Sequence, residues 1–337
     1  MIPRHRLALA TAALVAAVAA IPARAQEPAT LKFAFMPPPQ SPYIAQAIAP
    51  WKENVEKASQ GAVKIEIFYG PQLANYNNVL DRIGNAVVEI AYGIFGNLGN
   101  QFPDPNVTIL PFESEDAETP SVALWRLYAQ GLVHFDAARP LALFVFPYSS
   151  LHASKPVHTL EDMKGIKLGV FSRQLGEMTE LIGGTPVSLQ PTDVYQSMSR
   201  GVIQATLIGW AGVPTFKLQE VAPQHLDAPL GNSPGFIVMG KPAYGRLPDV
   251  GKRAIDAYSY ETFSRAMGQS GDRQANGARG FIGGMAGQSV YRLAPAEEAR
   301  WRKQLQPISE EWVKATPNGA AILAAYRAEM KKIRAEK

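Results

Sequence analysis

The amino-acid sequence predicts an α/β protein of two lobes, each a mixed or parallel sheet flanked by helices. Segments with the two-residue alternation of strands and segments with the periodicity of amphipathic helices follow one another along most of the chain. About 312 residues remain when the first 25 are set aside, which is enough for two domains of ordinary size. The sequence contains no cysteine, so each lobe depends on a hydrophobic core and not on disulfides.

Residues 1–25 have the features of a secretory signal peptide. Arg4 and Arg6 give a basic start, and residues 7–21 form an uninterrupted run of apolar and small side chains. Ala23-Arg24-Ala25 then places small residues at the two positions that a signal peptidase reads. The run is shorter than the roughly 20 residues that span a bilayer, which disfavours the alternative of an uncleaved membrane anchor. We therefore expect export, cleavage after Ala25 and a periplasmic location.

The first half of the chain has the repeated strand–helix pattern of a parallel sheet. Strands are predicted at 31–35, 63–68 and 87–92, and helices at 41–58 and 76–85. This β-α-β-α-β stretch predicts parallel pairing with right-handed crossovers.

The second half continues the pattern and ends in helices. Further strands are predicted at 141–146, 167–171, 202–208 and 236–239, and helices at 177–182, 193–200 and 295–313. In the last of these helices, apolar side chains recur on one face, as expected for a helix that covers a core; they are Trp301, Leu305, Ile308 and Trp312.

The charge pattern favours neither nucleic acid nor membrane as a partner. Lys and Arg number 33 against 29 acids, and without Arg4, Arg6 and Arg24 the balance is 30 against 29, a net charge of +1. The basic side chains are dispersed apart from a cluster in the last seven residues, and nucleic-acid binding requires a continuous basic stripe. No apolar segment after residue 25 reaches membrane-spanning length.

Catalytic and metal-binding patterns are missing from the sequence. The five histidines lack the spacing of zinc ligands, and His152, near a proline, is expected to be a hydrogen-bonding loop residue. No G-x-S-x-G elbow or phosphate-binding loop occurs, and the glycines of 93–99 are interpreted as a close-approach turn after a strand. A hydrolase or isomerase would need a converging pair of titratable groups, and the sequence indicates none. We therefore predict a binding protein without enzymatic activity, cofactor or metal.

Several short segments along the chain resemble the solute receptors of tripartite ATP-independent periplasmic (TRAP) transporters, in their order and spacing as well as their residues. The segments are YGPQL at 69–73, LPF at 110–112, HASKPV at 152–157, LEDMKGIK at 160–167, GTPV at 184–187, DVYQSM at 193–198, GVI at 201–203 and YRLAP at 291–295.

The resemblance implies a type II-like periplasmic binding protein fold with a long helix, placed near 250–279, that bridges the lobes. Lobe I is then expected to comprise 26–147 and 236–275, and lobe II 148–235 and 276–337. The implied function is capture of a small organic acid by hinge closure and delivery to integral membrane TRAP subunits, by a monomeric receptor. Two alternatives stay open, a receptor of an ATP-driven importer and a sensory binding protein.

Departures from the family pattern bear on the ligand. Many members have an arginine that grips a ligand carboxylate where this chain has Gly169, and Arg173 lies close enough to take over that role. Positions where relatives often place a pocket phenylalanine and a pocket asparagine correspond to Pro191 and Ile208. These departures favour a monocarboxylate with an apolar or aromatic body over a C4-dicarboxylate.

Candidate ligand contacts follow from the rule that open α/β sheets bind ligands outside the carboxyl ends of their strands. We expect Arg173 to bind a carboxylate and Trp210 to stack on the ligand, the alternatives being a solvated surface arginine and a tryptophan packed within its lobe. The remaining candidates at strand ends are Phe35, Met36, Gln72, Tyr92, Phe95 and Phe171.

Overall fold

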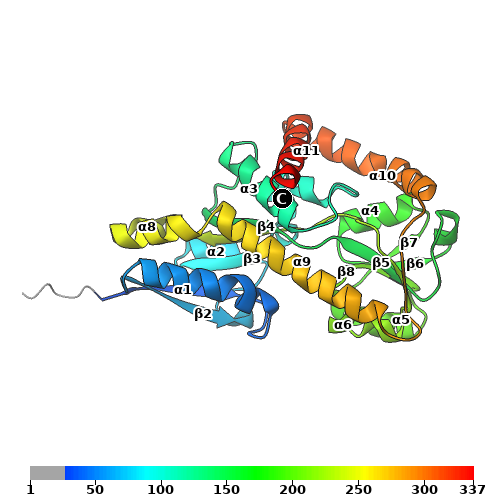
Figure 1. The fold of residues 1–337 in the computed structure, drawn as a ribbon, viewed down its shortest axis with the longest axis horizontal. Helices are drawn as coiled ribbons and strands as arrows, with labels where there is room; N and C mark the ends of the chain where they lie inside the picture. Colours follow the sequence, from blue (N-terminus) through cyan, green and yellow to red (C-terminus); the bar gives the residue numbers. More distant parts are fainter. Residues whose placement is uncertain (1–26) are drawn as a thin grey trace, which may run out of the picture.

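The computed structural model describes residues 27–337 and places them in two lobes, each built on its own sheet (Figure 1). The predicted signal peptide lies outside the described residues. The sheet of lobe I has the strand order β2-β1-β3-β10-β4, in which β1 pairs parallel with β2 and β3, confirming the predicted pairing. Its strands are β1 (Ala29–Phe35), β2 (Val63–Tyr69), β3 (Ile90–Ile94), β4 (Arg139–Val145) and β10 (Pro234–Met239).

The sheet of lobe II is mixed and has the order β11-β9-β5-β8-β6-β7. Four of its short strands, β5, β7, β9 and β11, were not predicted. The sequence of β5 looked like a loop because it leads into Pro156, yet β5 lies at the centre of the sheet between β9 and β8. The strands are β5 (Ser149–Ala153), β6 (Lys167–Val170), β7 (Thr185–Ser188), β8 (Ala205–Gly209), β9 (Gln224–Leu226) and β11 (Ser289–Tyr291).

Helices cover both sheets, and α3 is one that the sequence did not predict. Its residues from Thr119 to Leu124 are all buried, so the helix lacks the polar face that would have produced an amphipathic pattern. The helices of lobe I are α1 (Ala49–Ala58), α2 (Val79–Gly84), α3 (Glu118–Ala129), α7 (Lys241–Gly245) and α8 (Asp249–Tyr258). A π-helical turn, η1 (Ile44–Ile48), precedes α1. The helices of lobe II are α4 (Arg173–Leu181), α5 (Val194–Ser199) and α6 (Gly212–Thr215).

Short 3-10 turns connect these elements. They are η2 (Gly70–Gln72), η3 (Phe95–Gln101), η4 (Asp104–Ile109), η5 (Glu161–Met163), η6 (Pro191–Asp193) and η7 (Leu218–Glu220). The predicted close-approach turn over 93–99 was wrong in its place: a β-carbon would lie 2.1 Å from the Phe236 ring at Gly93, which is inside β3, whereas nothing lies within 4 Å of one at Gly96 or Gly99.

Helix α9 (Glu261–Gly283) runs from lobe I to lobe II, as Figure 1 shows. It packs on α3 and β4 of lobe I and reaches α6 of lobe II. The continuous helix predicted over 250–279 was wrong at one point, because the chain breaks between α8 and α9. There Tyr260 has a φ of 70°, its N–H donates to the Leu141 carbonyl, and the Ser259 hydroxyl accepts from Trp51 Nε1.

Close packing of α9 on α3 requires a glycine at position 268. A β-carbon there would lie 2.6 Å from Glu118 Cα and 2.7 Å from the Ala117 carbonyl oxygen, both backbone atoms. Gly268→Ala is therefore expected to lower the free energy of unfolding by about 1–3 kcal/mol, measured by urea denaturation. The control is Gly277→Ala on the same helix, where nothing lies within 4 Å of the added carbon. That variant should be neutral or more stable by up to about 1 kcal/mol, and equal losses in the two variants would contradict the prediction.

The C-terminal helices α10 (Pro295–Ala315) and α11 (Gly319–Ala335) form a further connection between the lobes (Figure 1). Helix α10 packs on α4 of lobe II, whereas α11 packs on α3 of lobe I, where Arg126 pairs with Glu336 at 2.9 Å. The expected membership of 276–337 in lobe II therefore does not hold for α11. The reason is that its apolar side chains complete the core around α3.

Two segments that cross between the lobes run side by side. The Phe146 amide donates to the Ser233 carbonyl, the Ser149 amide to the Gly231 carbonyl, and the Leu230 amide to the Ser149 carbonyl. The first segment follows β4 of lobe I and leads into β5 of lobe II. The second follows β9 of lobe II and leads into β10 of lobe I. Among the described helices, none combines the length and apolar character needed to cross a membrane.

Candidate functional site

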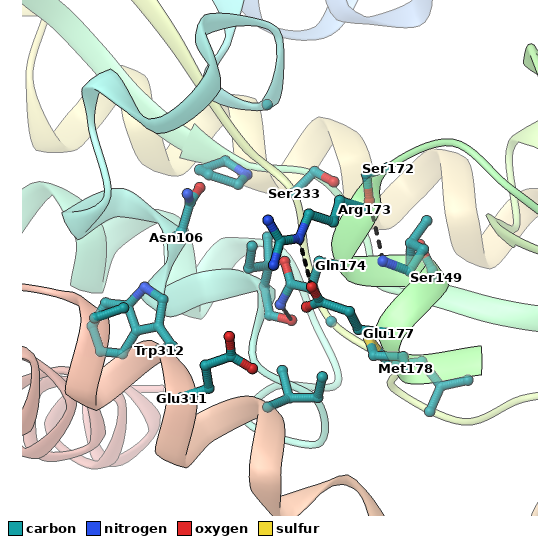
Figure 2. Close-up of a pocket in the computed structure, with 18 of the residues that line it drawn as sticks. Asn106, Ser149, Ser172, Arg173, Gln174, Glu177, Met178, Ser233, Glu311 and Trp312 are labelled. Atoms are coloured by element: carbon teal, nitrogen blue, oxygen red, sulfur yellow. Dashed lines mark hydrogen bonds and ion pairs between the residues drawn. The ribbon is translucent and has the colours of Figure 1, made fainter. Parts of the chain in front are cut away.

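A cleft of about 540 Å³ lies where the two lobes and α10 meet (Figure 2). The carboxyl end of β3 contributes Ile94, and the loop after β6 contributes Ser172. Because β10 is antiparallel to β3 and β5 is antiparallel to β8, the amino ends of β10 and β5 lie at the same edges and contribute Pro234 and Ser149. The cleft therefore occupies the position that the strand-end rule predicts for a ligand.

Much of the cleft wall is apolar. Trp312 of α10 forms part of it and is held in place, since its Nε1 donates to the Pro103 carbonyl of lobe I at 3.2 Å. This bond joins α10 to lobe I, whereas α4, on which α10 also packs, belongs to lobe II. The other apolar lining residues include Ile94, Ile109, Leu175, Met178, Leu230 and Ile308.

The charged groups of the cleft are Arg173, Glu177 and Glu311, of which Arg173 is the single cation among the described lining residues. Arg173 is the first residue of α4, whose amino end is capped by Ser172, and its Nε donates to Glu177 Oε1 at 2.7 Å. The hydrogen bond and the charge of Glu177 raise the pKa of Arg173. The Arg173 side chain is 85% exposed, and both of its Nη groups remain without a partner in the described chain.

A buried carboxylate that is not among the cleft-lining residues joins α9 to lobe II. Asp227 accepts hydrogen bonds from Trp210 Nε1, Tyr148 Oη and Arg279 Nη1, each at 2.8 Å. Burial raises the pKa of Asp227, but these hydrogen bonds and the Arg279 charge outweigh burial and hold it below the ordinary value. Arg292 Nε also pairs with Asp227 at 3.4 Å, so the partners of this anion come from four separate segments.

The sequence profile of a known family, described as bacterial extracellular solute-binding protein, family 7, matches residues 33–315. This chain belongs to that family. Members of family 7 are receptors that bind solutes, so the chain is a binding protein and not an enzyme, as predicted.

Relatives of this family 7 receptor match it over nearly their whole length. The outer membrane transporter protein TsaT of Comamonas testosteroni is 28% identical over 96% of this chain and 98% of its own. The C4-dicarboxylate-binding periplasmic protein DctP of Rhodobacter capsulatus is 25% identical over 95% and 96%. A marine metagenome TRAP solute-binding protein specific for aromatic acids, solved with metahydroxyphenylacetate, is 26% identical with a TM-score of 0.80, covering 90% and 98%. The predicted TRAP receptor family and two-lobed fold are confirmed.

Of the eight candidate contacts, Arg173 alone lines the described cleft of the receptor. Four aromatic candidates are at most 2% exposed: Phe35 and Tyr92 pack edge to face at 4.9 Å, Phe95 packs on Phe236, and Trp210 binds Asp227. Burial raises the pKa of the Tyr92 hydroxyl well above its ordinary value. These rings form the cores of the lobes. The last three candidates lie elsewhere: Met36 and Phe171 are partly buried against those cores, and Gln72 is exposed in η2.

Gly169, the position at which many family members have an arginine, is closed off by packing. A β-carbon on Gly169 would lie 2.9 Å from Ile203 Cδ1 and 3.2 Å from Leu189 Cδ1. Aliphatic side chains therefore fill the space into which a longer side chain would extend. The cation of this receptor's cleft stands four residues further along, at Arg173.

His152 is a hydrogen-bonding residue, as expected, but it lies in β5 and not in a loop. It is fully buried, with Nδ1 2.8 Å from His225 Nδ1 and Nε2 3.1 Å from the Ile208 carbonyl. Burial, followed by the influence of His225, lowers the pKa of His152 to about 3, so the ring is neutral at physiological pH. Within residues 27–337, no group of three or more His, Asp or Glu side chains is arranged to hold a metal ion.

Several cleft residues were not among the sequence-based candidates. Glu177 had a usable signal, because an acid four residues after Arg173 on a helix places the two side chains on one face. Glu311 and Trp312 had none, since the helical pattern assigned Trp312 to a core-facing stripe. Their position in the cleft depends on how α10 packs across α4, which is a tertiary contact.

Proposed function

We propose that this family 7 protein is an extracytoplasmic receptor that captures a small organic acid with one carboxylate and an apolar or aromatic body. It then delivers that acid to the membrane subunits of a TRAP transporter. The observation that carries the proposal is the cleft itself, which combines an apolar wall with Arg173 as the one cation among its described lining residues.

Arg173 is suited to bind the ligand carboxylate. Glu177 occupies only Nε, which leaves both Nη groups for a bidentate contact of the kind guanidinium groups make with carboxylates. The side chain also starts at the first residue of α4, where the helix dipole favours a negative charge nearby.

The apolar wall of the cleft is suited to contact the apolar or aromatic body of the ligand. Trp312, Ile94 and Leu175 line the cleft and are only partly buried, so they offer surface against which an aromatic or branched body loses contact with water. The marine relative is specific for aromatic acids and the Rhodobacter relative binds C4-dicarboxylates. A cleft with one cation and two acids supports the first kind of ligand, because a second ligand carboxylate would find no second cation among the described lining residues.

Hinge closure would complete the site. The cleft walls come from both lobes, and the lobes are joined by the paired segments 146–149 and 230–233 and by α9. A ligand that touches both walls stabilises the closed arrangement, which the membrane subunits would recognise. We further propose that the mature receptor begins at Gln26 in the periplasm and acts as a monomer.

A thermal-shift screen of the receptor tests the proposed ligand class. Benzoate, phenylacetate and branched monocarboxylates are expected to raise the melting temperature, since a ligand that binds only the folded state stabilises it. At 100 times Kd the stabilisation is about 2.7 kcal/mol, which for a protein of this size shifts the melting temperature by a few degrees. Stabilisation by succinate and malate but by none of the monocarboxylates would refute the proposed ligand class.

A further inference from the structure

Glu311 is an acidic side chain in the cleft that the carboxylate–arginine pairing leaves unexplained. Figure 2 shows its carboxylate extending from α10 toward the Arg173–Glu177 pair on α4. Glu311 is exposed and makes no hydrogen bond or ion pair within the described chain, although its charge, after that of Glu177, also helps to raise the pKa of Arg173, whereas Glu177 is neutralised by Arg173. The cleft therefore carries a net charge of −1 from Arg173, Glu177 and Glu311 before any ligand enters.

An unpaired carboxylate facing a ligand acts on it in two ways. It repels a second negative charge, because like charges brought together during closure of a cleft cost several kcal/mol, or a factor of about 100 or more in affinity. It also accepts a hydrogen bond from a ligand donor, and hydrogen bonds to charged groups strengthen binding by about tenfold or more. Arg173 has neither effect, because its positive charge attracts a second carboxylate and a guanidinium group donates hydrogen bonds but does not accept them.

We propose that Glu311 is a specificity-determining residue. It selects acids that carry a hydrogen-bond donor at the end remote from their carboxylate, and it excludes acids that carry a second carboxylate there. This inference rests on the proposed function, in which Arg173 holds the first carboxylate. Helix α10 packs on α4 and carries Glu311 beside the Arg173–Glu177 pair, and the neighbouring Trp312, whose Nε1 donates to the Pro103 carbonyl of lobe I, would support the ligand body.

Matched ligands and a matched variant separate these effects. The probes are phenylacetate and its 3-hydroxy, 3-aminomethyl and 3-carboxy derivatives, which share one body and differ only at the remote end. The variants are Glu311→Gln and, as control, Glu310→Gln on the same helix, whose carboxylate accepts from Gln306 and does not line the cleft. Affinities are measured by isothermal titration calorimetry at neutral pH.

The natural protein is expected to bind the hydroxy compound at least about tenfold more tightly than phenylacetate, and the carboxy compound at least about 100-fold more weakly. In Glu311→Gln the hydroxy preference should fall to about threefold or less and the carboxy penalty should shrink at least tenfold, while Glu310→Gln keeps both ratios. The aminomethyl compound shows whether the preferred donor is a hydroxyl or an ammonium group.

The outcomes distinguish this inference from the proposed function. If phenylacetate and its derivatives bind but Glu311→Gln leaves both ratios as in the natural protein, Glu311 is not the selecting residue, although the proposed function stands. If none of the four compounds binds while another monocarboxylate of the thermal-shift screen does, the inference fails and the proposed function stands; if no monocarboxylate binds, both fail. Measuring phenylacetate itself in Glu311→Gln, where binding should be retained, shows that the variant is folded and competent.

Discussion

Replacing Arg173 with alanine is expected to weaken the binding of an organic monocarboxylate at least about 30-fold. The physical reason is that truncating one partner of a charge pair that becomes enclosed on binding leaves the ligand carboxylate without its counter-charge. Arg173 is the one cation among the described lining residues, so no neighbouring cation of the cleft compensates. Isothermal titration calorimetry with benzoate or phenylacetate measures the change directly.

Arg200→Ala provides the control for this variant. Arg200 is an exposed arginine of the same lobe, at the end of α5, and it does not line the cleft. Its replacement should leave affinity within about twofold, because an exposed surface charge contributes little. Arg173 is itself exposed and paired only with Glu177, so Arg173→Ala should keep the melting temperature of the natural protein. Affinity retained in Arg173→Ala would show that the carboxylate is bound by other groups.

Asp227→Ala is expected to lower the free energy of unfolding by about 3–5 kcal/mol. The variant removes the counter-charge of Arg279 and Arg292 and leaves the Trp210 and Tyr148 donors without their acceptor. Breaking a buried ion pair by removing one partner has a cost of this size because the remaining charge stays partly desolvated. Urea denaturation measures this loss of stability. The control is Asp136→Ala, since Asp136 is exposed and its side chain has no partner in the described chain. Its free energy of unfolding should stay within about 0.5 kcal/mol of the natural protein.

The difference in stability between the natural protein and Asp227→Ala is expected to depend on pH. The pKa of Asp227 is below its ordinary value in the folded state, so its contribution is present at neutral pH and is lost as pH falls below the unfolded value near 4. The stability difference between the natural protein and Asp227→Ala should therefore be constant from about pH 6 to 8 and narrow at lower pH. A difference that widens on acidification would mean that Asp227 is protonated in the folded protein at neutral pH.

The buried Asp227 network also lies close to the hinge. Helix α9 contacts lobe II there, because Arg279 donates to Asp227 and to Tyr148. Tyr148 directly precedes Ser149, which lines the cleft and pairs with the crossover segment at Gly231. Loss of the Asp227 anchor is thus expected to affect the hinge region as well as overall stability, and ligand titrations of Asp227→Ala at low temperature can separate the two.

Local patterns in the sequence were sufficient for the class of protein and for the first sheet. The alternation in 31–35, 63–68 and 87–92 reflects strands with one face in a core, and it predicted the parallel β1–β2 and β1–β3 pairs that the structure contains. The ordered segments that resemble TRAP receptors predicted the family, which the match over residues 33–315 confirms. The first result rests on neighbouring residues, and the second on short segments whose order and spacing extend along the chain.

Elements whose environment is set by distant contacts escaped this approach. Helix α3 is buried almost all round and so shows no amphipathic pattern, and β5 acquires its buried position only by pairing with β8 and β9. Tyr260 adopts a positive φ where an uninterrupted helix was expected, because its backbone amide binds Leu141 far away in the chain. Local sequence does not encode such partners.

The candidate site divides in the same way. The sequence alone, with its resemblance to TRAP receptors, indicated a two-lobed receptor without catalytic spacing, a glycine at 169 where many such receptors have an arginine, and a nearby cation at Arg173. Only the tertiary structure decided that Phe35, Tyr92, Phe95 and Trp210 complete the lobe cores, since a strand-end position does not reveal which neighbours cover a side chain. It also brought Glu311 and Trp312 into the cleft, because α10 is folded back across α4 from more than 100 residues along the chain.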